Sequence, residues 1–409
     1  MVEIHVIDVL RGINAVLNIW NVKVLCISGF FSGLVFGFLY WSLPIITEKI
    51  AGIEFVGIFY SLNYVVSLVF PTLGGTLSDV LGRRKIIIAS TLMDLIGLSF
   101  LYLGCVASNG LLFGIGFLIY EGASLIGSSA LYAILAESTD EENMAKGYSA
   151  AYMFNILGCG IGSIILGLVF SVSVLNSLII CSIIITCAFI SRLFLKETLK
   201  NKKTIKTYCK EIVNSFKSLQ YLRLVGLFIM LLTILIAIET SIDGPYYSIY
   251  MSDIGKFSTF EISVVFALIP ISQAMIQPFV GTITDKKGSL ASILIGNLIG
   301  GLGVLVFILS PDKMLSATSL IIASMIGSFH NIGYRTLIAK ATEESHRGLI
   351  FGSLESLTAL SSLPFPFIGA ILWKLSTKFP FIVSIILSLI ISVITLIVAK
   401  KEKSKLMKE

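Results

Sequence analysis

The sequence predicts an all-α integral membrane protein in which twelve transmembrane helices form two bundles of six. Hydrophobic residues make up 56% of the chain and charged residues only 13%, a balance too apolar for a soluble domain. Twelve apolar stretches are each long enough to cross a bilayer core of about 30 Å, which needs roughly 20 helical residues. A polar loop in the first half of the chain also returns in the second half.

The predicted spans follow one another along the whole chain. They are helices, because the apolar stretches lack the strict alternation and the short segments of a membrane β-barrel. We expect an N-terminal segment at 1–21, a first bundle at 22–195, a linker at 196–222, a second bundle at 223–400 and a tail at 401–409. The spans begin near residues 24, 53, 86, 110, 148, 173, 223, 259, 289, 314, 349 and 379.

The basic residues predict the orientation in the membrane. If both termini are cytoplasmic, most of the 30 Lys and Arg residues lie on the inner side, as the positive-inside rule requires. The formal net charge of +6 then reflects topology and attraction to anionic lipids of the inner leaflet, and no nucleic-acid motif is present. We expect a multi-pass protein of the cell membrane.

Two polar segments flank or interrupt the spans. Polar and apolar residues of segment 1–21 alternate at helical spacing, which predicts an amphipathic helix on the inner interface, not a cleavable signal peptide. The linker at 196–222 is rich in lysine, so it either lies against the inner leaflet or is a solvated connection. At its start, Leu195-Lys196-Glu197-Thr198-Leu199 combines an acid with a hydroxyl group.

The repeated loop is the most specific pattern in the chain. Its first copy runs from Gly75 to Lys85 and reads GTLSDVLGRRK, and its second runs from Gly281 to Ser289 and reads GTITDKKGS. This loop resembles the signature of the major facilitator superfamily of transporters. The resemblance implies parallel repeats of six spans that face each other across a midplane cavity. The ending of the sixth span at Glu197 and Thr198 is similar to the family pattern as well.

The resemblance implies that the first loop is a cytoplasmic latch. In the family, an acid, a base and a second acid hold the two halves together on the inside, and we assign these roles to Asp79, Arg83 and Glu137. Asp79 is expected to face the start of a helix near Gly348. The alternative is a structural turn whose glycines pack closely and whose charges set topology. The full candidate set is Gly75, Asp79, Gly82, Arg83, Arg84, Glu137, Asp285 and Gly288.

The second loop departs from this pattern. Ser289 replaces the arginine, and Lys340 stands where the second acid would be, so the corresponding ion pair cannot form. Asp285 can still cap a helix start near Gly147. We therefore predict two unequal latches, of which the second is weaker.

Five charged residues within the spans need a reason, because an ionised side chain at the bilayer centre costs on the order of 3 kcal/mol. Glu121 shares a helical face with Ser124, Ser128 and Tyr132 near the midplane, and desolvation favours the protonated form of a carboxyl group. It is our first candidate for a proton carrier, although a carboxyl group hydrogen-bonded for packing is an equal alternative. The further candidates are Asp94, Glu239 and Glu355, and Glu355 is also expected to form a structural ion pair with Arg335.

Polar and aromatic residues elsewhere in the spans are candidates to line a substrate cavity. An interhelical hydrogen bond is the alternative for the histidine among them. The candidates are Tyr40, Trp41, Asn63, Ser128, Tyr132, Asn155, Gln273, Gln277, His330 and Asn331.

The function predicted is secondary transport of a small molecule, with a proton or another ion as the coupling partner. No enzyme motif is present, and we expect no cofactor, no metal and a monomer. Proton-driven drug exporters of the family usually carry an arginine in the fourth span and a Gly-Pro signature in the fifth; here the arginine is missing and only Gly158-Cys159-Gly160-Ile161-Gly162 partly matches. We predict efflux of a drug-like or amphiphilic metabolite, with proton-coupled uptake of a sugar, organic acid or other metabolite as the alternative. A non-transporting sensor or scaffold is a third class.

Overall fold

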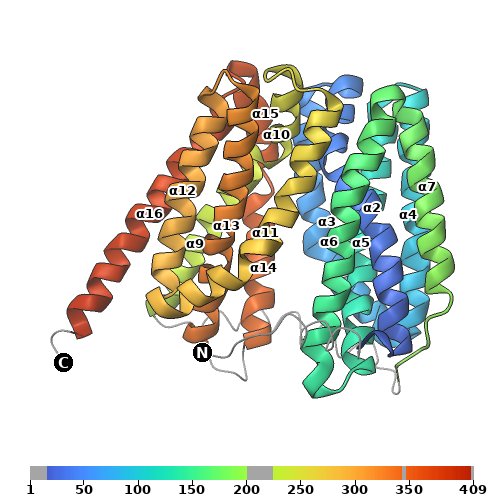
Figure 1. Ribbon diagram of the computed structural model, residues 1–409, viewed down its shortest axis with the longest axis horizontal. Helices are drawn as coiled ribbons and strands as arrows, with labels where there is room; N and C mark the ends of the chain where they lie inside the picture. The colour runs from blue at the N-terminus through green and yellow to red at the C-terminus, as the bar shows by residue number, and fades with distance from the viewer. Residues whose placement is uncertain (1–15, 200–223, 343–346, 407–409) are drawn as a thin grey trace. The chain divides into compact units, whose positions relative to one another are not determined.

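The computed structural model describes residues 16–199, 224–342 and 347–406. Most of the predicted N-terminal segment 1–21 and of the linker 196–222 therefore lies outside the described residues. Within the described part every regular element is a helix (Figure 1). Twelve segments in this part, each a single helix or a run of consecutive helices, are long and apolar enough to cross a membrane. This finding confirms the predicted fold class.

The helices begin close to the predicted positions. In chain order they are α2 (Trp20–Ala51), α3 (Ile53–Leu81), α4 (Arg83–Val106), α5 (Gly110–Ser138), α6 (Glu141–Val172), α7 (Val174–Arg192), α9 (Leu224–Asp243), the short 3₁₀ helix η2 (Gly244–Tyr246), α10 (Tyr247–Asp253), α11 (Thr259–Lys287), α12 (Ser289–Leu309), α13 (Lys313–Ala341), α14 (Arg347–Ser362), α15 (Phe365–Leu375) and α16 (Phe379–Leu406).

Two spans are interrupted where the sequence predicts single helices. The seventh consists of α9, η2 and α10, and the break falls at Gly244-Pro245. The eleventh consists of α14 and α15, and the break falls at Pro364. Proline has no backbone N–H and its ring clashes with the preceding turn, so a helix breaks or kinks there.

The described residues group into two compact units. Of the described residues, the first comprises 16–51, 66–199 and 258–267, and the second comprises 52–65, 224–257, 268–342 and 347–406. These units differ from the predicted bundles in two places: the first part of α3 groups with the second unit and the first part of α11 with the first. Within the second unit, Gly57 of α3 lies against the backbone of Pro366 and Phe367, and Ser61 accepts a hydrogen bond from the N–H of Phe367 at 3.2 Å.

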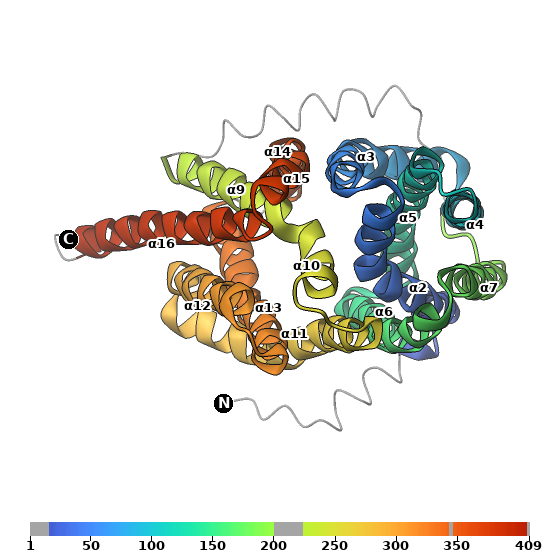
Figure 2. The same cartoon turned by 90° about the horizontal axis from the view of Figure 1, so that it is seen from above.

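In the first unit, α4 packs along α5 and α7, and α2 packs along α6 and α7 (Figure 2). Glycines permit the closest of these contacts. A Cβ atom at Gly158 of α6 would lie 3.0 Å from the backbone nitrogen of Leu34, and Gly162 also faces the backbone of Leu34. Small residues four apart allow two membrane helices to approach backbone to backbone. The partial signature in the fifth span therefore forms the α2–α6 contact.

In the second unit, α12 packs against α13 and α16, and α9 packs against α14 and α16. An aromatic cluster fills the space where the interrupted seventh span meets α12 and α16. Tyr247 lies edge-on to Phe381 with ring centroids 5.0 Å apart, and Tyr250 contacts both Phe307 and Phe381. Because the helix is interrupted after Asp243, Tyr247 and Tyr250 lie in the core of this unit.

Candidate functional site

The first copy of the repeated loop joins α3 to α4 through a single residue, Gly82. Its φ of +114° is a backbone conformation that L side chains rarely adopt, so only glycine is unstrained there. A Cβ atom at this position would also meet the Glu197 carboxylate at 2.5 Å. The glycine lets α4 begin directly after α3 and brings Asp79 and Arg83 together.

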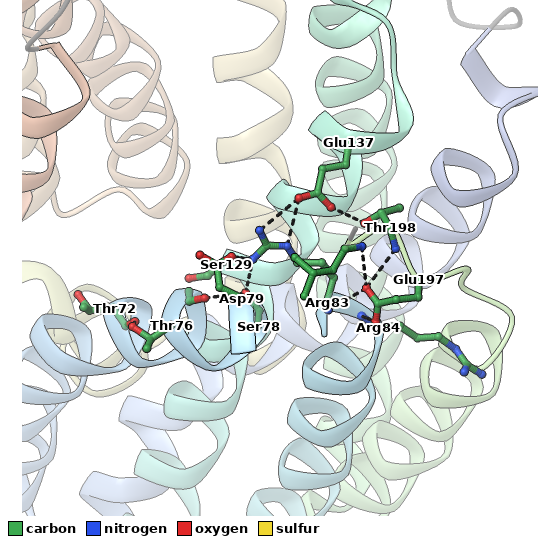
Figure 3. Close-up of polar contacts among 12 residues, drawn as sticks. Thr72, Thr76, Ser78, Asp79, Arg83, Arg84, Ser129, Glu137, Glu197 and Thr198 are labelled. Carbon is green, nitrogen blue, oxygen red and sulfur yellow. Dashed lines mark hydrogen bonds and ion pairs between the residues drawn. The ribbon is translucent and has the colours of Figure 1, made fainter. Parts of the chain in front are cut away.

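Arg83 connects two acids at this end of the unit (Figure 3). Its guanidinium pairs with Asp79, one turn earlier on α3, and its Nη2 lies 3.2 Å from Oε1 of Glu137 at the end of α5. Nη1 also donates to the Ser78 hydroxyl at 2.7 Å. Asp79 is only 5% exposed, so this ion pair is largely shielded from water. The structure thus contains the acid–base–acid contacts that the sequence predicts, and their role as a latch stays a prediction.

Glu197 makes a contact in this loop that was not predicted from the sequence. Its carboxylate accepts hydrogen bonds from the backbone N–H groups of Arg83 at 3.0 Å and Arg84 at 3.2 Å (Figure 3). The neighbouring Thr198 hydroxyl donates to Glu137. The first N–H groups of a helix have no intrahelical acceptor and favour a negative charge. The signal was present in the sequence, because α4 begins Gly-Arg-Arg-Lys with no side chain of its own that could cap it.

Replacing Glu197 with glutamine should weaken this cap. A neutral amide accepts fewer hydrogen bonds than a carboxylate and does not balance the helix dipole, so we expect a loss of about 1 kcal/mol in stability. Thermal unfolding of the purified protein in detergent measures this loss. Glu355→Gln is the control, since Glu355 forms an exposed ion pair with Arg335 and lies in the middle of α14, away from its first turn. An equal effect of both changes would contradict the prediction.

The second loop repeats the backbone but not the charges. Gly288 precedes α12 with a φ of +87°, as Gly82 precedes α4. A Cβ atom at Gly288 would meet nothing within 4 Å, so no acid of the described residues takes the place that Glu197 has in the first loop. Asp285 and Lys340 are exposed, and Asp285 makes no hydrogen bond or ion pair with the described residues. The two loops are therefore unequal in their contacts.

For the second loop, the predicted position of one helix start is wrong. Asp285 is predicted to cap a helix start near Gly147. The helix in question, α6, begins at Glu141, and Gly147 lies inside it. The start was misplaced because the apolar stretch begins only at residue 148, whereas the polar first turns are already helical. The helix expected near Gly348 begins at Arg347, and its contact with Asp79 stays a prediction.

Two of the proton-carrier candidates lie close together inside the first unit. Asp94 of α4 is 6% exposed, and both Glu121 of α5 and Arg192 of α7 are near enough for their charges to interact with it. Arg192 was not singled out in the sequence, where it looks like one more basic residue at the inner end of a span. It is 7% exposed and donates to Thr91 at 2.6 Å and to Ser32 at 2.8 Å.

The other charged candidates lie in the second unit. Glu239 of α9 accepts a hydrogen bond from Ser388 of α16, so it connects two helices. Arg335 and Glu355 lie 3.7 Å apart with side chains that are 60% and 67% exposed, and Arg335 also donates to Asn331 at 3.0 Å. The pair joins α13 to α14 as the sequence predicts, and its high exposure keeps its contribution to stability small.

The cavity candidates divide into exposed and packed residues. Trp41 is fully buried and donates to Ser163 at 3.0 Å, so it belongs to the core of the first unit and not to a cavity wall. This prediction is wrong, because residue type alone does not tell which face of α2 is packed.

Three other cavity candidates form hydrogen bonds within the protein. Asn155 donates to the carbonyl of Gly29, Gln273 donates to that of Ser324, and His330 is hydrogen-bonded to Asn297 at 2.6 Å. The exposed candidates are Tyr40, Tyr132, Gln277 and Asn331, whereas Asn63 and Ser128 are half-buried.

Among the residues that the structure describes, no group of three or more His, Cys, Asp or Glu side chains is placed to hold a metal ion. A sequence model of the Major Facilitator Superfamily matches residues 25–242 and 229–408. The chain belongs to the major facilitator superfamily. This transporter is thus a multi-pass membrane protein that acts on small molecules and is not an enzyme.

Two relatives of the transporter have names that state what they act on. The tetracycline resistance protein, class C, of Escherichia coli is 23% identical over 331 residues, which cover 79% of this chain and 81% of that protein. The quinolone resistance protein NorA of Staphylococcus aureus is 25% identical over 137 residues, only 34% of this chain and 35% of that protein. An MFS-type transporter of Methanocaldococcus jannaschii, MJ1317, is 24% identical, with 92% and 94% covered.

Solved structures share the fold of the transporter. The nucleoside transporter NupG superposes with a TM-score of 0.76 at 14% identity and covers 92% of this chain and 97% of its own. A peptide transporter of the POT type in complex with sulfate reaches 0.73 at 14% identity, with 94% of each chain covered. At such low identity these similarities show the fold alone.

Proposed function

We propose that this protein exports an amphiphilic small molecule in exchange for protons. The observation that carries the proposal is its similarity to the tetracycline resistance protein over 81% of that protein's length. The partial match to the quinolone resistance protein supports the same class of cargo. Both names describe resistance to amphiphilic antibiotics, so efflux of such compounds is the activity we favour over uptake.

Glu121 is the coupling acid in this proposal. It lies on α5, is partly exposed, and forms no hydrogen bond with any described residue. Several hydrogen bonds to a carboxyl group stabilise one of its protonation states. A carboxyl group without such bonds gains or loses its proton more readily when its exposure to water changes. The carboxyl group of Glu239 is held by Ser388 and is therefore the weaker candidate.

An exposed group of tyrosines suits an amphiphilic cargo. Tyr132 of α5 and Tyr152 of α6 are 57% and 58% exposed, and Tyr148 donates from its hydroxyl group to the carbonyl of Tyr132 at 2.9 Å. Aromatic rings attract both apolar groups and organic cations. These three rings lie on α5 and α6, the helices that carry the acid Glu137 and the base Lys146. They are our first candidates for cargo contacts.

The test is proton movement in inside-out vesicles that carry an imposed pH gradient. Ethidium, tetracycline, a neutral drug, a sugar and an organic acid are added in turn to vesicles with wild type, Glu121→Gln or Glu239→Gln at matched protein amounts. We expect an amphiphilic compound to release protons from the gradient with wild type and Glu239→Gln. With Glu121→Gln the flux should fall to the level of empty vesicles.

Each outcome separates the alternatives. A flux triggered only by a sugar or an organic acid would support uptake of such a metabolite instead of efflux. Flux that survives Glu121→Gln but not Glu239→Gln would move the coupling acid to the second unit. If no compound moves protons while a labelled compound still equilibrates across the membrane, proton coupling is wrong.

A further inference from the structure

Three charged side chains, two buried and one partly exposed, lie near one another where α5 and α7 pack against α4. Asp94 of α4 and Arg192 of α7 are each more than nine-tenths buried. The Oδ1 atom of Asp94 and the Nε atom of Arg192 are both buried without any hydrogen-bond partner. Glu121 of α5 is the third member, close enough to Asp94 to repel it. Uncompensated buried charges are costly, so a site that keeps two of them beside a third charged group needs a reason.

Close helix packing holds the three residues together. Gly97 lies one turn after Asp94, and a Cβ atom there would lie 2.8 Å from the backbone nitrogen of Tyr120, the residue before Glu121. The backbones of α4 and α5 therefore touch beside the acids. Arg192 is the last residue of α7, and its guanidinium is held by Thr91 of α4 and Ser32 of α2. The two α4 partners, Thr91 and Asp94, are three residues apart and thus lie on the same face.

The charges of this site balance only when one proton is bound. Two carboxylates and one guanidinium have a net charge of −1, whereas two carboxyl groups that share one proton beside Arg192 are neutral. The groups that face Asp94 are Tyr120 and Glu121 from α5 and Arg192 from α7, and Cys181 of α7 lies near Tyr120. None of these other groups supplies a second positive charge. A neutral site is strongly favoured in an apolar interior.

We propose that Asp94, Glu121 and Arg192 form a single proton-binding site and that it carries the coupling proton of the transporter. This inference rests on the proposed function for its role in transport, but not for the existence of the site. Glu121, the less buried of the two acids, exchanges the proton with water. Arg192 does not carry the proton; it is a positioning residue that limits the site to one proton.

The proton step has a structural consequence for Arg192. When Glu121 releases its proton to water, the O–H bond breaks, the electron pair stays on the carboxylate, and the site gains one negative charge. The new negative charge attracts the guanidinium away from Thr91 and toward the two carboxylates. Since Ser32 of α2 also holds Arg192, this movement loosens a contact between α2 and α7. Proton release is thereby linked to a change in helix packing.

The test counts protonated carboxyl groups by infrared spectroscopy. The protein is reconstituted into lipid at neutral pH without any cargo, and the absorption of protonated carboxyl groups is compared between wild type and variants. Asp94→Asn and Glu121→Gln should each lose one protonated group per molecule, because one acid then remains to pair with Arg192. Arg192→Gln should gain one, and Arg192→Lys should match wild type.

Two further variants serve as controls for the infrared measurement. In Asp94→Asn/Arg192→Gln, one acid remains without a base, so the count should return to that of wild type. Arg335→Gln removes an exposed arginine and should change nothing. If either acid can be replaced without loss of a protonated group, the acids are independent and the shared site is wrong. Should Arg192→Gln fail to fold, Asp94→Asn/Glu121→Gln decides instead, because this variant loses one protonated group in all if the acids share a proton and two if each acid holds its own.

A transport measurement separates this inference from the proposed function. Ethidium efflux is measured in vesicles with and without a pH gradient. If the infrared pattern holds but efflux by wild type ignores the gradient, the proposed proton coupling is wrong, and with it the role of this site in transport. If efflux follows the gradient but the infrared pattern fails, the proposed function stands and this site is not its proton carrier.

Discussion

Asp79→Asn should lower the transport rate by at least about tenfold, which corresponds to about 1.4 kcal/mol. The amide keeps the size of the side chain but removes a charge that is 5% exposed and paired with Arg83. Arg83 is then left with Glu137 as its acidic partner, and breaking a buried ion pair from one side is costly. If the pair stabilises one state of the transport cycle, its loss shifts the balance between states.

Asp285→Asn is the matched control for this change, because the two aspartates occupy the same place in the repeated loop. Asp285 is exposed and Ser289 stands where an arginine would pair with it, so we expect a reduction of less than about twofold. The rates are measured in proteoliposomes with equal amounts of each variant. Equal losses from both changes would reject the unequal latches.

Gly162→Ala should destabilise the protein by about 1–3 kcal/mol through overpacking. Gly162 faces the backbone of Leu34 across the α2–α6 contact, and a methyl group there meets main-chain atoms, which cannot rotate away as a side chain would. The helices must move apart or bend, and the neighbouring contact of Gly158 with Leu34 is lost with them. Thermal unfolding in detergent, followed by the fraction that remains monodisperse, measures the effect.

Gly327→Ala in α13 is the control, because an added Cβ atom there meets nothing within 4 Å. Alanine is otherwise the better helix former by about 0.5–1 kcal/mol, so this variant should be neutral or slightly more stable. A loss of stability from Gly327→Ala as large as that from Gly162→Ala would show that helix packing is not the cause.

The pairing of Asp79, Arg83 and Glu137 could be predicted because it depends on short-range geometry. Asp79 and Arg83 are four residues apart around a tight turn, and Glu137 ends the span that returns to the same side of the membrane. The contact of Glu197 with the start of α4 could not be predicted with the same certainty. It depends on where the chain runs after α7, which no local spacing decides.

By itself, the sequence determined the twelve apolar helices and the repeated loop with its unequal charges. The physical reason is that a bilayer requires about 20 apolar residues per span and favours basic residues on one side. Local composition is therefore enough to predict these features. Only the tertiary structure decided that Trp41 is in the core, that Gly158 and Gly162 pack on α2, and that Asp94, Glu121 and Arg192 meet. In membrane helices apolar residues face lipid and core alike, so hydrophobicity does not distinguish the two faces, and only packing between helices does.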